Sequence, residues 1–397
     1  MRIVVIGASL AGVRTVQALR RAGSEAHITL VDAHHEVACD RPPLSKKFLS
    51  NSAAAPIPVA TSAQLHEMDV ELVLGRRATD LDVGARSVGL HGGGRLGYDA
   101  LVVASGSTPR TAPGLEPRPG VHVLRTAEHA AALRAGLAGA ARTVIVGGGF
   151  IGSEVASTAR GMGCDVTIVE PLPTLMVRGL GPVLGEVLTR RHAAAGVDLR
   201  LGIGVAGIEG RDRVEGVRLA DGSLIAADQV VLGLGTTPEV AWLADAGLQL
   251  RDGLVCDEHL AAVGTDGVYA AGDVARWWHP RYGEHVRVEH WTNAVEQALV
   301  VAANLAGTPT VYDAPPYVWS DQLGSRLQVV GRVRPQDDVR FVHGGPGEER
   351  FVAVTGGDGS LQSVVGFGAV RELMPYRKLL VEGATWAAAL DLAGIPA

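Results

Sequence analysis

The chain places short runs of β-branched and other apolar residues directly before clusters of glycine. One run covers residues 2–6 and precedes Gly7, and a second covers residues 143–146 and precedes Gly147. After the first cluster the apolar residues recur with a helical spacing to about Ala22. A short, continuous apolar run is typical of a buried parallel strand, and the spacing that follows it predicts a helix. The sequence therefore predicts a strand, a glycine turn and a helix in two distant places.

The two copies also share their small residues and a later acidic residue. In the first copy a second strand over residues 26–31 ends in Asp32, and the small residues of the turn are Gly7, Ser9 and Gly12. In the second copy the helix runs to about Met162, a strand over residues 165–169 ends in Glu170, and the glycines are Gly147, Gly149 and Gly152. The acid follows the first glycine by 25 positions in one copy and by 23 in the other.

Each copy contains the parts of a dinucleotide-binding βαβ unit. The first glycine makes the turn, the second lets the backbone approach a pyrophosphate, and the third lets the helix pack on the strand. The helix N-terminus offers N–H groups to phosphate, and the acid accepts hydrogen bonds from a ribose. Ser9 replaces the second glycine of the first copy, and we expect it to be tolerated because its side chain is small and its hydroxyl can contact phosphate. The repeat thus predicts two nucleotide sites.

A third segment also ends in a glycine and an acid. A strand through Tyr269 leads to Gly272 and Asp273, and a helical start is expected after them. The polyol linker of a flavin dinucleotide needs an acceptor such as Asp273, but an aspartate at this place is also typical of a helix N-cap. The residues alone favour the two interpretations about equally.

Composition and charge exclude several classes of protein. Hydrophobic residues make up 47% of the 397-residue chain, which excludes an intrinsically disordered protein. The formal charge is −6, which excludes a broad basic surface for binding nucleic acid. Cys39, Cys164 and Cys256 form no pair or metal-ligand cluster, and no metal site is expected. Since no leader or membrane-spanning run is recognised, we expect a cytoplasmic protein that does not bind membranes.

Taken together, the motifs resemble the FAD-dependent NADH:ferredoxin (rubredoxin or putidaredoxin-type) reductases that serve oxygenases and cytochromes P450. Two strings are specific to this branch, RPPLSK at residues 41–46 and WSDQ at residues 319–322. The other matching segments, common to the wider flavoprotein superfamily, are residues 7–12, 102–110, 147–154, 233–238 and 269–273. The resemblance implies an α/β fold of glutathione-reductase type, with two Rossmann-like dinucleotide-binding domains and a C-terminal α/β domain with an antiparallel sheet.

The same resemblance implies the domain boundaries. It places a discontinuous FAD domain at residues 1–112 and 241–312, an NAD domain at 113–240 and a C-terminal domain at 313–397. The sequence supports the joints independently, because Pro-rich segments occur at residues 109–119 and 315–316. Beyond them, alternating segments at residues 326–333 and 350–354 predict antiparallel strands.

The resemblance also implies roles for single residues. It places Lys46 beside the flavin N5, where a cation stabilises arriving electron density, and pairs it with Glu154 on the first turn of the NAD helix. Trp319 completes the catalytic set. The residues expected to bind FAD are Gly7, Ser9, Ala11, Gly12, Asp32, Arg41, Lys46, Ala78, Arg125, Gly272, Asp273 and Trp291. Those expected to bind NADH are Gly147, Gly149, Ile151, Gly152, Glu170 and Gly235.

For some of these residues an ordinary structural role competes with the functional one. Lys46 can be an exposed lysine like Lys47, although the chain has only three lysines. Trp291 and Trp319 can be core residues. Glu170 favours NADH over NADPH, because its carboxylate binds a ribose 2′-hydroxyl and repels a 2′-phosphate.

The leading hypothesis is therefore an enzyme that passes a hydride from NADH to FAD and then single electrons to an iron–sulfur ferredoxin or rubredoxin. The chain is expected to act as a monomer or weak homodimer. An apoptosis-inducing-factor type of NADH sensor or NADH oxidase is the main alternative, and a reductase of quinones or dyes is another. Dithiol chemistry is disfavoured, because Cys39 has no partner cysteine near the first helix.

Overall fold

The computed structural model describes residues 1–357 and 359–396. By their contacts these residues form two compact units, each built from three separate stretches of chain. Unit 1 comprises Met1–Asp40, Pro56–Thr108 and Thr236–Ala314, and unit 2 comprises Arg41–Ala55, Pro109–Gly235 and Pro315–Ala397. The predicted division into three domains is finer than this grouping and stays a prediction.

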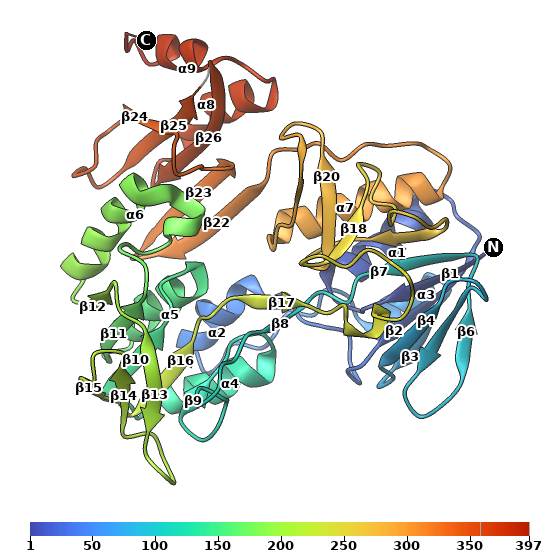
Figure 1. The fold of residues 1–397 in the computed structure, drawn as a ribbon, viewed down its shortest axis with the longest axis horizontal. Coiled ribbons are helices and arrows are strands. Elements are labelled where there is room, and N and C mark those ends of the chain that lie inside the picture. Colours follow the sequence, from blue (N-terminus) through green and yellow to red (C-terminus); the bar gives the residue numbers. More distant parts are fainter. Residues whose placement is uncertain (358, 397) are drawn as a thin grey trace. The chain divides into compact units, whose positions relative to one another are not determined.

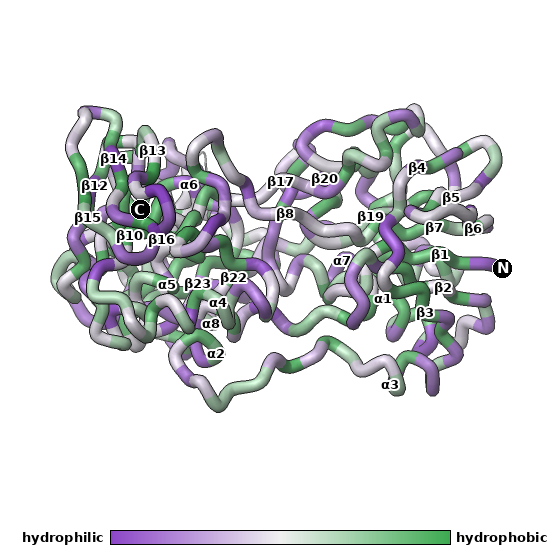
Figure 2. Tube along the Cα trace, turned by 90° about the horizontal axis from the view of Figure 1, so that it is seen from below, coloured by the Kyte–Doolittle hydropathy of each residue, from purple (hydrophilic) through white to green (hydrophobic). Residues whose placement is uncertain are grey.

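Unit 1 is organised around a parallel sheet in the order β19-β7-β1-β2-β3 (Figure 1). Its strands are β1 (Arg2–Ile6), β2 (His27–Asp32), β3 (Val70–Leu74), β7 (Ala100–Val103) and β19 (Val268–Ala270). Figure 2 shows the central strands β1, β2 and β7 as mainly hydrophobic, as expected for strands buried on both faces. Helices α1 (Leu10–Arg21) and α7 (Trp291–Leu305) pack against each other.

Smaller elements complete unit 1. Two sheets lie outside the parallel one, β4-β5-β6 and β18-β20-β21. Their strands are β4 (Ala78–Asp82), β5 (Ser87–Leu90), β6 (Arg95–Gly97), β18 (Leu254–Cys256), β20 (Ala275–His279) and β21 (Glu284–Val286). The short helices are α3 (Ser62–Glu67) and η2 (Ala241–Leu243), and β8 (Ser107–Pro109) pairs with β17 (Thr236–Pro238).

Unit 2 contains a second parallel sheet, in the order β12-β11-β10-β16-β9. Its strands are β9 (Val121–His122), β10 (Arg142–Val146), β11 (Asp165–Glu170), β12 (Asp198–Leu201) and β16 (Gln229–Leu232). The helices of this part are α4 (Ala127–Leu137), α5 (Phe150–Gly161) and α6 (Val177–Ala194), and a small antiparallel sheet has the strands β13 (Val205–Glu209), β14 (Gly216–Leu219) and β15 (Leu224–Ala226).

The C-terminal part of unit 2 is an antiparallel sheet in the order β22-β23-β26-β25-β24. Its elements are β22 (Tyr317–Gln322), β23 (Ser325–Gly331), β24 (Asp338–His343), β25 (Phe351–Gly357), β26 (Ser360–Phe367), α8 (Val370–Val381) and α9 (Trp386–Leu392). Leu184 and Leu188 of α6 share one buried cluster with Phe351 and Phe367, and the same cluster includes residues of β10, β11 and β16. The antiparallel sheet and the second parallel sheet therefore have a common core.

The stretch Arg41–Ala55 contributes two short helices to unit 2, η1 (Pro42–Ser45) and α2 (Lys47–Ser50). Both contact α5, and Leu49 joins the same buried cluster as the helices α4 to α6. Prolines open η1 because a proline at the start of a helix loses no hydrogen bond. Lys46 is the residue between the two helices, so its backbone is held by packing on both sides.

The sequence predicted most of this architecture. The strands and helices of both glycine repeats lie within a residue or two of their expected bounds, and the strands expected at residues 326–333 and 350–354 are antiparallel. One element was predicted wrongly. The helical start expected after Asp273 is the strand β20, so Asp273 is not a helix N-cap. Within the described residues, every helix is too short or too polar to cross a membrane.

Candidate active site

The glycine turn of unit 1 is held by close backbone packing that leaves no room for side chains. Gly7 has φ 114°, and a Cβ atom there would lie 2.2 Å from the carbonyl oxygen of Ala104. A Cβ on Gly12 would lie 1.9 Å from the carbonyl oxygen of Gly7. Helix α1 therefore begins directly against strand β1, which brings its first N–H groups to the carboxyl end of the sheet.

The turn of unit 2 repeats the same construction. Gly147 has φ 106°, and its Cβ would lie 2.3 Å from the carbonyl oxygen of Gly233. A Cβ on Gly152 would lie 2.0 Å from the carbonyl oxygen of Gly147. The backbone amides of Gly7 and Gly147 also bond to matching carbonyls, those of Val31 and Val169. Two sequence segments that share few identical residues thus form the same backbone cradle.

The acids at the ends of the second strands close these cradles. Asp32 Oδ2 accepts a hydrogen bond from the Ala8 amide at 2.6 Å and Oδ1 accepts one from the His34 amide. Glu170 Oε2 accepts from the Gly148 amide at 2.7 Å and Oε1 from the Leu172 amide. Each carboxylate is fixed beside the glycine turn with lone pairs left over, as a ribose-binding acid requires.

The first turns of α1 and α5 fit a bound phosphate. Neither turn contains an acidic residue that would compensate the positive end of the helix dipole. A Cβ on Gly149 would meet no atom within 4 Å, so the space over this turn is open to a ligand. In unit 1 the Ser9 side chain makes no capping hydrogen bond to α1. The residues present therefore fit two dinucleotides.

The remaining unit 1 residues of the predicted FAD set lie near this turn or in neighbouring elements. A Cβ on Gly272 would lie 3.0 Å from the Ala11 Cβ. Asp273 Oδ2 accepts a hydrogen bond from Ser107 Oγ at 2.7 Å, a partner that the sequence did not indicate. Trp291 begins α7 and its indole N–H donates to Asp40 Oδ1 at 2.8 Å. Ala78 is buried in β4.

A buried ion pair in unit 2 joins the two residues predicted to be catalytic. Lys46 Nζ lies 2.7 Å from Glu154 Oε2, and the side chains are 18% and 5% exposed. Lys46 is therefore not the exposed lysine that its neighbour Lys47 is. Glu154 lies one residue beyond the first turn of α5, so the expected placement in that turn is corrected by one position. A charge pair at this depth persists only when both partners are present and hydrogen-bonded.

Three serine and glutamine side chains support this pair, and none of them was singled out from the sequence. Ser45 Oγ donates to Glu154 Oε2 at 2.5 Å, and Ser320 Oγ donates to Glu154 Oε1 at 2.5 Å. Gln322 Nε2 donates in turn to Ser320 Oγ at 2.8 Å. The signal was present, because all three residues belong to the RPPLSK and WSDQ strings, but only Lys46 and Trp319 were singled out there.

Trp319 lies on the other face of β22 from Ser320, because side chains alternate along a strand. Its ring is half-buried and lies 6.0 Å from that of Tyr317. The other predicted residues of unit 2 are more dispersed. Arg41 precedes η1, Arg125 follows β9, and Ile151 is exposed on α5. The carbonyl oxygen of Gly235 accepts a hydrogen bond from the backbone amide of Arg110.

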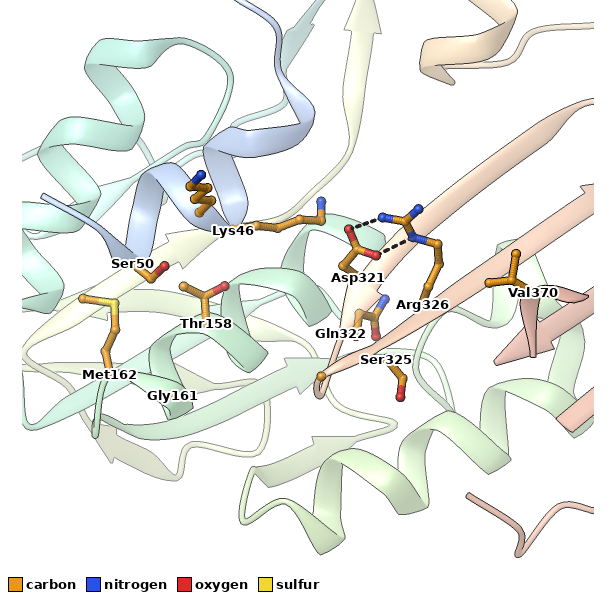
Figure 3. Close-up of a pocket in the computed structure, with 12 residues that line it drawn as sticks. Lys46, Ser50, Thr158, Gly161, Met162, Asp321, Gln322, Ser325, Arg326 and Val370 are labelled. Carbon is orange, nitrogen blue, oxygen red and sulfur yellow. Dashed lines mark hydrogen bonds and ion pairs between the residues drawn. The ribbon is translucent and has the colours of Figure 1, made fainter. Parts of the chain in front are cut away.

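A groove of about 990 Å³ opens beside Lys46 (Figure 3). The Asp321–Arg326 ion pair forms part of its wall, with a distance of 2.7 Å between Oδ1 and Nε. It is lined by Lys46, Lys47, Ser50, Thr158, Gly161, Met162, Asp321, Gln322, Gly324, Ser325, Arg326 and Val370. Among the described residues, no three His, Cys, Asp or Glu side chains gather closely enough to hold a metal ion.

Two dinucleotide cradles and a third, antiparallel domain define the class of two-dinucleotide-fold oxidoreductases. Comparison with known proteins agrees. Residues 1–298 match the model of the pyridine nucleotide-disulphide oxidoreductases, and residues 317–393 match that of the reductase C-terminal domain. The chain belongs to the pyridine nucleotide-disulphide oxidoreductase family. The predicted family, fold class and class of enzyme are confirmed.

Relatives of known function are similar over nearly the whole chain. The ferredoxin reductase component of chlorobenzene dioxygenase from Cupriavidus sp. (strain PS12) is 37% identical, over 95% of this chain and 92% of that protein. The ferredoxin reductase for the CYP199A2 system from Rhodopseudomonas palustris is 32% identical with a TM-score of 0.91, over 99% and 98% of the two chains. The covalent putidaredoxin reductase–putidaredoxin complex gives 31% identity and a TM-score of 0.91, over 96% and 93%.

Proposed function

We propose that this chain is the reductase of an oxygenase or cytochrome P450 system, and that it carries electrons from NADH through FAD to a ferredoxin or rubredoxin. The observation that carries the proposal is the buried Lys46–Glu154 pair beside α5, in a chain that has two dinucleotide cradles. The family match and the relatives' names confirm the predicted cofactors, FAD and NADH, and the kind of protein partner.

The overall reaction oxidises one NADH to NAD⁺ with release of a proton, while two one-electron acceptors are reduced. FAD, when bound, supplies a group that accepts a hydride and gives its electrons up singly. Lys46 provides a fixed positive charge for the electron density that arrives near it. Glu154 holds the Lys46 ammonium in place and leaves an anionic acceptor beside the first turns of α5.

The residues proposed to bind the two nucleotides are those of the two glycine turns and the acids beside them. We assign Gly7, Ser9, Gly12 and Asp32 to FAD, together with the rest of the FAD set named from the sequence. The second cradle, with Gly147, Gly149, Gly152 and Glu170, is assigned to NADH. The Glu170 carboxylate is buried and held by two amides, so it cannot turn away from a 2′-phosphate. We therefore expect NADH to be preferred over NADPH.

The test begins with the purified holoenzyme, which should be yellow. NADH should bleach the flavin absorbance faster than NADPH, and addition of a ferredoxin should then support steady reduction of cytochrome c. A protein that bleaches with NADH but never reduces cytochrome c through any ferredoxin or rubredoxin would instead be a sensor of the apoptosis-inducing-factor type. Faster turnover with quinones or dyes than with every ferredoxin would favour the small-molecule reductase.

Substitution of Cys39 distinguishes the proposed electron transfer from an enzyme that uses a thiolate. Cys39, Cys164 and Cys256 form no disulfide, and burial of Cys256 raises the pKa of its thiol above the usual range. We expect Cys39→Ser to leave NADH-dependent flavin reduction unchanged. Loss of turnover in this variant would point to an oxidase or peroxidase that uses a single thiolate. We place the reaction in the cytoplasm, where reduced thiols and soluble ferredoxins occur together.

A further inference from the structure

A buried line of hydrogen bonds leads from helix α6 through strand β22 to the Glu154 carboxylate. His192 Nε2 lies 3.0 Å from Gln322 Oε1, and Gln322 Nε2 donates to Ser320 Oγ at 2.8 Å. Ser320 Oγ donates to Glu154 Oε1 at 2.5 Å. The exposed fractions of His192, Gln322 and Ser320 are 0%, 1% and 0%, so water does not compete with these bonds.

The chemistry of the groups fixes the direction of every bond in this line. The amide nitrogen of Gln322 can only donate and its oxygen can only accept, so His192 must carry its proton on Nε2. Ser320 accepts from Gln322 and therefore has its own proton available for Glu154. Burial lowers the pKa of His192 and so keeps the imidazole neutral, although the Gln322 contact acts in the opposite direction.

The second oxygen of Glu154 meets donors as well. Ser45 Oγ and Lys46 Nζ both contact Oε2, and Lys46 Nζ is also held by the carbonyl oxygen of Pro42 at 3.1 Å. The carboxylate is thus an acceptor on both sides and its rotation is blocked at both oxygens. If Ser320 stopped donating, Oε1 would be a buried acceptor without a partner, which favours rotation of the carboxylate away from Lys46.

We propose that Ser320 and Gln322, backed by His192, are positioning residues that orient Glu154 so that it holds Lys46 in place. This gives the WSDQ string a role beyond Trp319, since its second and fourth residues share the buried face of β22. The proposal deepens the assignment of the Lys46–Glu154 pair and rests on the proposed function for the purpose of that pair. The hydrogen-bond line itself can be tested without turnover.

The small number of lysines makes Lys46 a direct reporter. The chain contains only Lys46, Lys47 and Lys378, and the last two are exposed and act as internal standards. Trace acylation of the purified holoenzyme with acetic anhydride, followed by peptide mass spectrometry, gives the reactivity of Lys46 relative to Lys47. We expect a low ratio in the wild type, because the Lys46 ammonium is partly buried and paired with Glu154.

Two variants interrupt the line at different bonds. Gln322→Glu keeps the size of the side chain but turns the donor that faces Ser320 into an acceptor, so the Ser320 proton is drawn away from Glu154. Ser320→Ala removes the hydroxyl altogether. We expect the Lys46 to Lys47 acylation ratio to rise about tenfold in both, which corresponds to loss of one charge-assisted hydrogen bond.

Ser363→Ala is the matched control. Ser363 is also a fully buried serine of the C-terminal sheet, and its Oγ bonds to Thr355 rather than to the line. We expect this variant to lose similar thermal stability in circular dichroism while its acylation ratio stays at the wild-type value. An unchanged ratio in both folded test variants, or an equal rise in Ser363→Ala, would overturn the proposal.

Stopped-flow reduction by NADH then separates the two levels of inference. We expect kcat for flavin reduction to fall about tenfold in Ser320→Ala and Gln322→Glu with a smaller change in KM, because orientation rather than nucleotide binding is lost. A raised acylation ratio with unchanged flavin reduction would support the positioning line and contradict the assigned role of Lys46. A wild-type protein whose flavin NADH does not reduce would contradict the proposed function. The acylation ratios would still show whether Ser320 and Gln322 hold Glu154 in place.

Discussion

Separating the Lys46–Glu154 pair should destabilise unit 2 much more than separating an exposed ion pair. Glu154→Gln keeps the size of the side chain but leaves the Lys46 ammonium without its anion. The Lys46 side chain is 18% exposed and the Glu154 side chain 5%, so little water can replace the lost partner. Removal of one member of a buried pair costs about 3–5 kcal/mol. We expect the lower end, about 3 kcal/mol, because the Pro42 carbonyl still binds Lys46.

Thermal unfolding followed by circular dichroism measures this loss. About 3 kcal/mol corresponds to a fall of about 6–12 °C in the Tm of a folding unit of this size. Lys46→Met should give a comparable fall, because it leaves the Glu154 carboxylate buried with only hydroxyl donors. The double variant should recover part of the loss, since neither charge is then left unpaired.

The Asp80→Asn variant is the control, because Asp80 pairs with Arg95 at 2.6 Å and both side chains are about half exposed. An exposed pair contributes at most about 1 kcal/mol. A Tm within about 2 °C of wild type for Glu154→Gln would refute the reasoning. A coupling free energy below about 0.5 kcal/mol between the Lys46→Met and Glu154→Gln changes would refute it as well.

Three further outcomes follow from the two cradles and from the partly buried His290. Glu170→Ser should lower the preference for NADH over NADPH by at least about tenfold in kcat/KM, since a charged hydrogen-bond acceptor is lost; equal ratios in mutant and wild type would contradict the role of Glu170. Gly149→Ala should fold normally and weaken NADH binding in equilibrium titrations, because its Cβ meets only open space within the protein. Gly152→Ala should unfold at lower temperature, because its Cβ would lie 2.0 Å from a carbonyl oxygen. A Gly149→Ala variant that unfolds at lower temperature than Gly152→Ala would contradict the proposed nucleotide-binding turn. Burial lowers the pKa of His290 from its usual 6.5 to about 4, so the unfolded chain binds a proton first as the pH falls. Wild type should therefore lose about 2–3 kcal/mol relative to His290→Gln in urea unfolding between pH 7.5 and 4.5, and parallel curves would contradict this.

The sequence was sufficient for the parts of the fold that depend on local pattern. The strand, glycine turn and helix around Gly7 and Gly147 were predicted because steric demands on glycine and the period of apolar residues are local. The strand after Asp273 was predicted wrongly as a helix for the same reason. The residues after Asp273 form β20, which is stabilised by pairing with β18 and β21, and that pairing depends on distant segments.

The candidate site also depends on contacts between distant segments, which local sequence pattern does not predict. The pairing of Lys46 with Glu154 came from the resemblance, since the two residues are far apart in the sequence and no local rule connects them. Ser320, Gln322 and His192 were missed because their importance appears only when β22 and α6 meet α5. The WSDQ string marked the segment, but the roles of its uncharged side chains depend on burial and on partners that only the structure shows.

Strand β22 has a further consequence for how this protein can change. Its odd-numbered residues from Tyr317 to Asp321 and its even-numbered residues Ser320 and Gln322 serve opposite sides of one ribbon. Substitutions at Trp319 or Asp321 can therefore alter one side of the strand without removing the hydrogen bond that Ser320 donates to Glu154 on the other side. Deleting or inserting a single amino acid before Trp319 would instead interchange the two sets. Changes in the length of this segment are therefore more disruptive than single substitutions, because they alter both sides at once.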